Sequence, residues 1–287
     1  MFHAVLIACA FAAAQMAYEP ITFDARMRPM VAVRIDGSPP VDMLMDTAAQ
    51  SSVLTEALAE SMKLPPVQEA IVVNGVAGSV MARAHHVRRM RNALFDARDT
   101  AVVALPGIGV TQARGILGID LFSGRKLVFD LAARRLAVDT SGPAVADHVA
   151  VRGSVDAKGL LHVPVTIDGV VIDALVDTGA EGSVANGAVL RALGWHDDDP
   201  RLKANGTITG ATIGGTIVRR GTVDRVTLGP VGFRGVPLTF TPSEEGTPRL
   251  ILGMDMLGLL QRFALDLPRG ELQLYVPPAA TPPRSGS

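Results

Sequence analysis

The fold is decided by one short pattern that occurs twice, as MLMDTAAQSSV at residues 43–53 and ALVDTGAEGSV at residues 174–184. In each copy, apolar residues lead directly into Asp-Thr and then into a loop of small residues. Such a sequence predicts a buried strand that ends in a tight turn. Because burial disfavours a charged carboxylate, Asp46 and Asp177 must each be hydrogen-bonded or paired.

The sequence on either side of this pattern repeats as well. VAVRIDG at residues 31–37 matches VPVTIDG at residues 163–169, and GILGIDLF at residues 115–122 matches LILGMDML at residues 250–257. Self-similarity of this length indicates two copies of one structural unit. The expected organisation is a signal peptide at 1–20, a first lobe at 23–139, a linker at 140–150, a second lobe at 151–276 and a flexible tail at 277–287.

Each copy is predicted to be mostly β-structure. Alternating apolar residues indicate strands that end at Asp-Gly turns, and glycine-punctuated stretches at 71–80 and 207–219 indicate hairpins. Two short helices are expected at 55–63 and 187–193, with Thr55 and Asn186 as N-caps. The fold class is therefore all-β with minor helix.

The composition excludes several classes of protein. The chain has 287 residues, 48% of them hydrophobic and 19% charged, which is typical of one or two globular domains rather than a disordered chain. A formal charge of −1 and 4% aromatic residues offer neither a basic surface nor stacking platforms, so no nucleic-acid partner is expected. The single cysteine, Cys9, excludes a disulfide framework and cysteine-ligated metal sites.

The N-terminus suggests export. Residues 4–14 form an apolar run of signal-peptide length, followed by small residues that suit cleavage between Ala14 and Tyr18. The stretch before the run lacks Lys and Arg, which leaves a buried first strand or helix as the alternative. A periplasmic or secreted location is expected, and lipid anchoring at Cys9 is not.

Two matching loops on two copies of one fold suggest that Asp46 and Asp177 meet. Two carboxyl groups in contact cannot both ionise easily, so they share one proton. The ionised group can then take a proton from a water, and the protonated group can donate to a substrate carbonyl. This chemistry needs no metal and no cofactor. The alternative is two turn aspartates that only cap local backbone.

These motifs resemble the aspartic peptidases of the pepsin and retroviral-protease superfamily, and most of all the bacterial retropepsin-like branch, here as two tandem copies in one chain. Asp46-Thr47-Ala48 and Asp177-Thr178-Gly179 match the family's Asp-Thr/Ser-Gly loops. Gly118 and Gly253 match the downstream apolar-apolar-Gly segment that packs under the loop.

The resemblance implies two closed, barrel-like β-lobes related by a pseudo-twofold axis, with a cleft between them. It also implies flaps, placed near 74–79 and 210–215. Thr47 and Thr178 would brace the loops. Ala48 departs from the usual glycine, and because alanine resists positive φ we expect a slightly skewed pair.

Other carboxylates and histidines are weaker candidates. Asp99-Thr100-Ala101 has the same motif but follows a polar stretch rather than a buried strand, and Asp139-Thr140-Ser141 ends the last strand of the first copy and leads into the linker. Neither is followed by the helix, hairpin and apolar-Gly segment. Asp120 and Asp255 are expected to bond local backbone. The adjacent pair His85-His86 points to opposite faces of a strand, so no metal site is expected there.

The leading hypothesis is an aspartic-type endopeptidase, a hydrolase that acts on extended peptides or unfolded proteins. Both aspartates lie on one chain, so a monomer could be complete. The alternatives are a non-catalytic peptide-binding or scaffolding module on the same fold, and a retaining glycosidase with paired carboxylates, which is disfavoured because a single tryptophan and two tyrosines leave little aromatic platform for sugar.

Overall fold

The computed structural model describes residues 16–67, 71–75, 78–106, 112–208, 216–242 and 246–277. Most of the expected signal peptide, the tip of the first expected flap, all of 210–215 and nearly all of the expected tail lie outside these residues. Among the described residues, no helix has the length and apolar character needed to cross a membrane.

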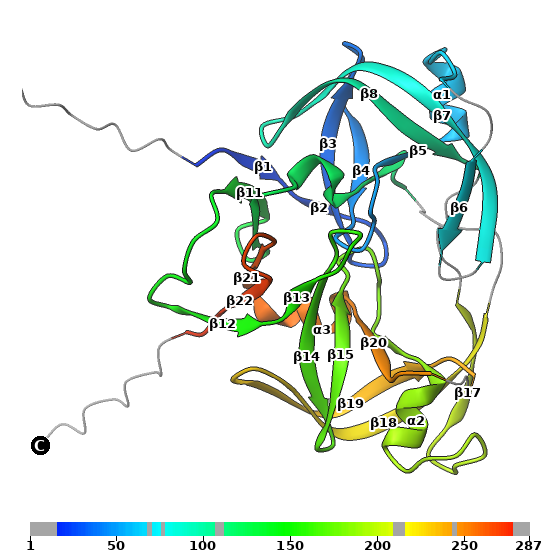
Figure 1. Ribbon diagram of the computed structural model, residues 1–287, viewed down its shortest axis with the longest axis vertical. Helices are drawn as coiled ribbons and strands as arrows, with labels where there is room; N and C mark the ends of the chain where they lie inside the picture. Colours follow the sequence, from blue (N-terminus) through cyan, green and yellow to red (C-terminus); the bar gives the residue numbers. More distant parts are fainter. Residues whose placement is uncertain are drawn as a thin grey trace, which may run out of the picture.

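The first lobe is an 8-stranded sheet, drawn at the top of Figure 1. Its strands, in the order in which they neighbour one another, are β2 (Thr22–Phe23), β3 (Pro29–Ile35), β4 (Val41–Met45), β9 (Gly115–Leu117), β5 (Val53–Thr55), β8 (Asp96–Leu105), β7 (Gly78–Arg91) and β6 (Ile71–Gly75). An additional pairing of β3 with β7 folds the sheet back on itself.

The second lobe repeats this order strand for strand. Its 8-stranded sheet contains β13 (Ser154–Val155), β14 (Leu161–Ile167), β15 (Val170–Val176), β20 (Arg249–Leu252), β16 (Val184–Ala185), β19 (Val231–Phe240), β18 (Thr216–Leu228) and β17 (Lys203–Ile208). The pairing of β14 with β18 matches that of β3 with β7. The predicted two-lobe, all-β fold is therefore confirmed.

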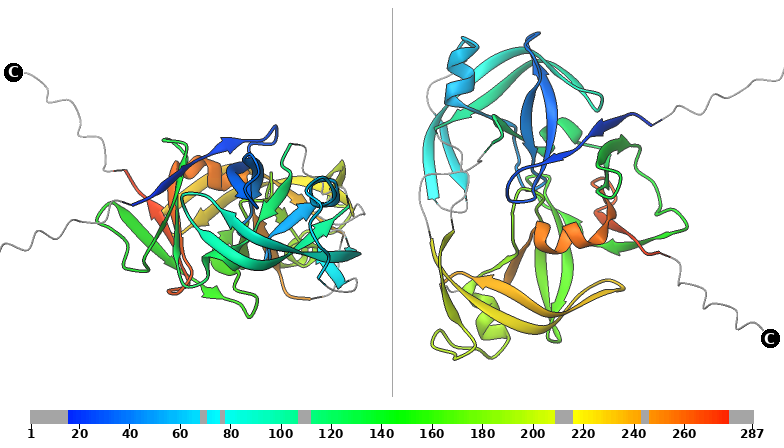
Figure 2. Two further views of the ribbon diagram at one scale, coloured as in Figure 1. Left: turned by 90° about the horizontal axis from the view of Figure 1, so that it is seen from above. Right: turned by 180° about the vertical axis from the view of Figure 1, so that it is seen from behind.

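A third sheet of 6 strands joins the lobes, on the side of the molecule where both ends of the described chain lie (Figure 2). Its order is β1 (Tyr18–Pro20), β11 (Arg135–Asp139), β10 (Lys126–Asp130), β21 (Arg262–Asp266), β22 (Glu271–Tyr275) and β12 (His148–Arg152). The central β10–β21 pair contains one strand from each copy. Across it, Phe129 and Phe263 stack with ring centroids 4.8 Å apart, and both are fully buried. One apolar core therefore runs through both lobes.

Local sequence explains the turns and helices. Asp36 and Asp168 have φ of 47° and 45°, and each precedes a glycine at positive φ, as a tight hairpin turn requires. Helix α1 (Glu56–Ser61) begins as predicted, because the Thr55 hydroxyl accepts a hydrogen bond from the Leu58 N–H at 3.2 Å.

Asn186 stands before α2 (Gly187–Ala192), but its side chain makes no capping bond. Asn186 occupies the N-cap position as predicted, but the side-chain capping bond expected there is absent. The Asn186 carboxamide instead accepts from the Arg249 N–H at 3.0 Å and donates to the Thr247 carbonyl at 2.9 Å. The side-chain oxygen of Asn186, which a capping bond would need, is therefore used by a tertiary contact to the first residue of β20.

Two elements lie across the expected boundaries. β1 contains residues of the expected signal peptide, and it pairs in register with β11 from Tyr18↔Ala137 to Pro20↔Arg135. β12 begins within the expected linker and pairs with β22. Both strands build the sheet between the lobes, so the folded unit includes residues that short-range sequence signals assign to connecting segments.

Candidate active site

The two Asp-Thr loops lie at the ends of equivalent strands and meet between the lobes. β4 runs parallel to β9, and β15 runs parallel to β20. The Asp46 N–H donates to the Leu117 carbonyl at 3.1 Å, and the Asp177 N–H donates to the Leu252 carbonyl at 3.0 Å. Each aspartate is thus hydrogen-bonded to the last apolar residue before the glycine that both copies share, which is Gly118 in the first copy and Gly253 in the second.

The threonines cross-link the two loops reciprocally. The Thr47 hydroxyl donates to the Val176 carbonyl at 2.8 Å, and the Thr178 hydroxyl donates to the Met45 carbonyl at 2.6 Å. Each hydroxyl also accepts from the other threonine's backbone N–H, at 3.1 and 3.2 Å. Both threonines are buried. Four hydrogen bonds in a water-poor interface therefore hold the loops in one relative position.

The carboxyl groups of Asp46 and Asp177 lie next to each other at the centre of this arrangement, close enough for each to perturb the pKa of the other. Asp46 is partly exposed, and Asp177 is buried. Backbone N–H groups support both: Ala48 donates to Asp46 Oδ1 at 2.9 Å, while Gly179 and Ala180 donate to Asp177 Oδ1 at 2.8 and 3.1 Å. The turn hydrogen bonds and the pair exist together, so the two interpretations of the sequence are not exclusive.

The environment favours one proton on this pair. Burial raises the pKa of Asp46, against the lowering effect of the Ala48 and Ala49 N–H groups, the Asp177 side chain and the Arg28 charge. Burial, followed by the charge of Asp46, raises the pKa of Asp177 well above its ordinary value. Two neighbouring carboxyl groups in this setting do not ionise together.

The reason for glycine in the loop differs from the one expected. Neither Ala48 nor Gly179 adopts a positive φ, so the reason given for a skewed pair at Ala48 does not apply. Position 179 requires glycine for steric reasons, because a Cβ there would lie 2.4 Å from Asp46 Cγ and Oδ2. Ala48 keeps its N–H bond to Asp46, so alanine is accommodated on its own side.

A serine and a second aspartate brace the first loop from below. Gly118 packs so closely that a Cβ would lie 2.7 Å from the Ala49 carbonyl oxygen. The Gly118 N–H donates to the Ser52 hydroxyl at 3.1 Å, which in turn donates to Asp120 at 2.9 Å. Burial raises the pKa of Asp120. Asp120 therefore supports the loop through Ser52.

The second loop has the same support. The Gly253 N–H donates to the Ser183 hydroxyl at 3.0 Å. Asp255 accepts from the Ser183 hydroxyl at 2.6 Å and from the Ser183 N–H at 3.0 Å. The two serines were not singled out from the sequence, although both precede the valine at the end of the repeated pattern. Their equivalent positions in the two copies were the sequence signal that could have identified them as supporting residues.

A buried ion pair beside the loops was also not anticipated. Asp24 and Arg28 lie in the turn before β3, and Arg28 Nη2 is 2.6 Å from Asp24 Oδ2. Arg28 Nη1 also donates to the Gly179 carbonyl of the other lobe at 3.3 Å. Nothing in the local sequence indicates this contact, which joins residues 151 positions apart.

The two other Asp-Thr sequences, at Asp99 and Asp139, lie away from the aspartate pair. Asp99 adopts φ 49° within β8 and lies 3.5 Å from His86 Nε2 on the surface. Asp139 ends β11 and lies 3.6 Å from Lys126 Nζ. His85 contacts the Leu64 carbonyl on the opposite side of its strand from His86. No cluster of metal-ligating side chains occurs within the described residues.

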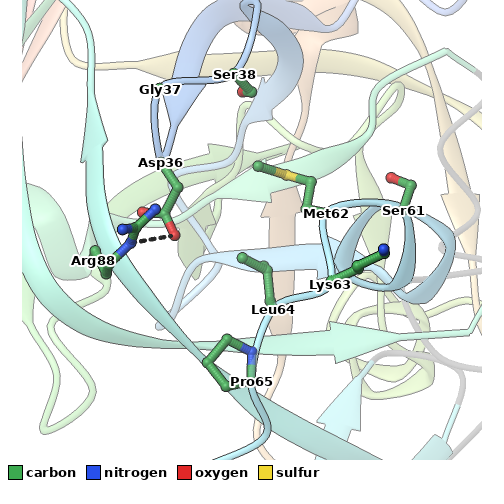
Figure 3. A pocket seen from close by; sticks show the side chains of 9 residues that line it. All are labelled: Asp36, Gly37, Ser38, Ser61, Met62, Lys63, Leu64, Pro65 and Arg88. Atoms are coloured by element: carbon green, nitrogen blue, oxygen red, sulfur yellow. Dashed lines mark ion pairs between the residues drawn. The ribbon is translucent and has the colours of Figure 1, made fainter.

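A hollow of about 580 Å³ lies on lobe 1, lined by residues 36–38, 61–65 and Arg88 (Figure 3). It is open and polar, and Arg88 Nε faces Asp36 Oδ2 across it at 3.5 Å. None of its residues belongs to either Asp-Thr loop. The hollow is therefore separate from the aspartate pair.

The family model for aspartyl proteases matches residues 31–121 and 163–256, one segment in each lobe and together more than half of the chain. The chain belongs to this family, as a retropepsin-like aspartyl protease with two tandem copies.

Solved structures that match include the crystal structure of a retropepsin-like aspartic protease from Rickettsia conorii. It is 21% identical with a TM-score of 0.35, over 44% of this chain and 98% of that one. No curated protein sequence matches the chain.

Proposed function

We propose that the protein is an aspartic-type endopeptidase in which Asp46 and Asp177 activate a water molecule for peptide-bond hydrolysis. The observation that carries the proposal is the position of the Asp46 carboxyl group against the second Asp-Thr loop at Gly179, fixed between the lobes by the reciprocal contacts of Thr47 and Thr178. General acid–base catalysis needs one group of each protonation state within hydrogen-bond reach of the reacting atoms.

The reaction follows from one shared proton. The ionised carboxylate takes a proton from water as the water oxygen bonds to the peptide carbonyl carbon, and the carboxylic acid donates its proton to the carbonyl oxygen. The tetrahedral diol then collapses. The amide nitrogen receives a proton from one carboxyl group and leaves as an amine, while a diol hydroxyl returns its proton to the other. Water is added across the C–N bond, and the pair is restored.

The expected substrate is an extended peptide or an unfolded protein. A separate apolar cluster connects Leu44 and Ile116, on strands beside Asp46, with Val73 and Val80 of the β6–β7 hairpin. Leu44 and Ile116 are buried, whereas Val73 and Val80 are only partly buried and β6 lies at the edge of the sheet, which suits a peptide that pairs as a strand and offers apolar side chains. Both aspartates are on one chain, so a monomer is a sufficient catalytic unit.

Hydrolysis of an unfolded protein between about pH 3 and pH 8 tests the proposal, with and without a transition-state-mimic inhibitor. Asp46→Asn and Asp177→Asn should each abolish cleavage, because each substitution removes one titrating half of the pair. Asp99→Asn is the matched control, since it alters the same Asp-Thr-Ala motif on the surface and should leave the rate unchanged. Substantial cleavage by the Asp177→Asn variant would refute the two-aspartate mechanism.

The alternative of a non-catalytic peptide-binding module depended on Ala48. Because the Ala48 N–H still supports Asp46, the structure adds nothing in its favour. The same assay distinguishes the two functions. Binding of the inhibitor without hydrolysis at any pH in this range would favour the binding module.

We further propose that the protein is exported to the periplasm or beyond the cell. The support is the apolar N-terminal run and the small residues that follow it. Expression in a Gram-negative host, followed by N-terminal sequencing, should find a mature start between Ala14 and Tyr18. Recovery of intact Met1 in the cytoplasm would contradict export.

A further inference from the structure

The turn that precedes β3 holds a buried cation on one side of the active site only. Asp24 Oδ1 accepts from the backbone N–H groups of Arg26 and Arg28, both at 2.9 Å. Asp24 Oδ2 accepts from Arg28 Nε and Nη2 at 2.8 and 2.6 Å. The two side chains are 0% and 8% exposed, which makes this a bidentate ion pair within the protein.

The second copy builds the same turn without the cation. Asp156 Oδ1 accepts from the Lys158 and Leu160 N–H groups at 2.8 and 2.9 Å, matching the pattern in lobe 1. The Asp156 N–H donates to the Leu160 carbonyl at 3.0 Å, as that of Asp24 does to Arg28 at 3.1 Å. Leu160 therefore stands where Arg28 stands. The turn does not require an arginine, and its presence in one copy needs another explanation.

The third arm of the guanidinium leaves the ion pair and crosses between the lobes. Arg28 Nη1 donates to the Gly179 carbonyl at 3.3 Å, while Nε and Nη2 remain on Asp24. Gly179 packs directly against the Asp46 carboxyl group, where even a methyl group would not fit. The buried positive charge thus lies beside Asp46. Leu160 has no donor to offer the equivalent carbonyl of Ala48.

We propose that Arg28 is a positioning residue that makes the two halves of the pair unequal, with Asp46 as the carboxylate that activates water and Asp177 as the acid that protonates the substrate carbonyl. This inference rests on the proposed function and assigns a role to each aspartate within it. The exposures agree, because the partly exposed Asp46 is better placed to bear charge than the buried Asp177.

The direction of the perturbations supports this assignment. Burial raises the pKa of Asp46, but the Arg28 charge works against that rise. Burial and the Asp46 charge together raise the pKa of Asp177 well above its ordinary value. At Asp24, burial acts to raise the pKa, and the hydrogen bonds and charge of Arg28 outweigh it. Asp24 therefore stays ionised and keeps Arg28 in place.

Other charged groups lie against the loops. Arg26 Nε is 3.7 Å from Glu181 Oε2 in the second loop, but both side chains are largely exposed. Beneath the loops, Asp120 and Asp255 are occupied by the hydroxyl groups of Ser52 and Ser183. These groups are distributed over both copies. Within the described residues, the Arg28 contact to Gly179 has no counterpart in the second copy, so Arg28 is the group to test.

The first experiment leaves Arg28 in place and needs no activity. Asp46→Asn and Asp177→Asn proteins are unfolded with urea at several pH values between about 4 and 8. In Asp46→Asn, the remaining Asp177 lies buried without a cation, so its folded pKa is raised and stability should fall as the pH rises towards that pKa. In Asp177→Asn, Asp46 keeps the Arg28 charge, and the fall should be smaller. Equal pH dependence in the two variants would overturn the proposal.

The second experiment introduces leucine at position 28, because Leu160 occupies the equivalent position of the second copy. Asp24→Asn combined with Arg28→Leu removes both charges together, so no buried charge is left alone. The acid limb of the kcat–pH profile should move upward by roughly one pH unit, because Asp46 loses the cation that favours its charge. The contrast between the two asparagine variants should become smaller in this background. Arg26→Leu removes a charge at an exposed position of the same turn. It should change neither the acid limb of the pH profile nor the contrast between the two asparagine variants.

The outcomes separate the two proposals. An unmoved acid limb with an undiminished contrast between the asparagine variants would show that Arg28 only stabilises its turn. A wild-type protein without hydrolysis at any pH would remove the proposed function, and the unfolding measurements would still decide how charge is distributed. If the double variant does not fold, equal pH dependence of Asp46→Asn and Asp177→Asn still overturns the proposal.

Discussion

Replacement of Gly179 by alanine would place a methyl carbon 2.4 Å from Asp46 Cγ and Oδ2, and 2.9 Å from Oδ1. Ordinary contacts of a Cβ begin near 3.4 Å, so the carboxyl group or the loop must move by about 1 Å. The Asp46 carboxyl cannot move freely, because the Ala48 N–H and the Asp177 side chain hold it. Overpacking of this kind costs about 1–3 kcal/mol of stability.

The larger effect is expected on catalysis. A misplacement of about 1 Å in an active site can lower the rate by roughly 100-fold. We therefore expect Gly179→Ala to reduce kcat by about two orders of magnitude while the protein stays folded. The measurement is steady-state cleavage of a fluorogenic peptide, with circular dichroism and urea unfolding as checks on the fold.

Ala48→Gly is the matched control at the equivalent position of the first loop. It keeps the backbone N–H that supports Asp46 and removes only a methyl group. We expect it to keep or raise activity. A Gly179→Ala protein as active as the wild type would show that the packing of Gly179 against Asp46 does not limit the geometry of the pair.

Three further changes test the supports of the site. Thr178→Val removes a donor and an acceptor from the buried loop interface and should cost about 2–5 kcal/mol in urea unfolding, while a loss below about 0.5 kcal/mol would mean that the cross-link is not structural. Because burial raises the pKa of Asp177 in the folded protein, stability should fall as pH rises from about 4, and Asp177→Asn should reduce that fall; an unchanged slope would count against the raised pKa. Ser183→Ala leaves the buried Gly253 N–H without its acceptor and should cost about 1–3 kcal/mol, with near-wild-type stability as the contrary result.

Much of the fold could be predicted from local patterns that occur twice. Alternating apolar residues indicated strands at 31–35 and 163–167, which β3 and β14 confirm. The Asp-Gly turns and the Thr55 cap were also readable, because each depends on backbone preferences of a few neighbouring residues. Repetition added the strongest information, since two copies of one pattern imply the same local structure twice.

Local patterns failed where a distant partner competes for a side chain. The Asn186 carboxamide bonds near β20 instead of capping α2, and β1 joins a sheet built from both lobes. In both places the winning interaction comes from a segment far along the chain, which short-range signals do not contain.

The repeat, the two Asp-Thr loops and the strand at whose end each aspartate lies could all be predicted from the sequence, because they depend on residue order within short windows. How the two copies face each other became visible in the three-dimensional arrangement alone. This arrangement brought Thr47 against Val176, placed Gly179 against Asp46, and carried the Arg28 side chain from one lobe to the loop of the other. These contacts depend on distances of a few ångströms between residues more than 100 positions apart, and only the packing of both lobes on one core fixes such distances.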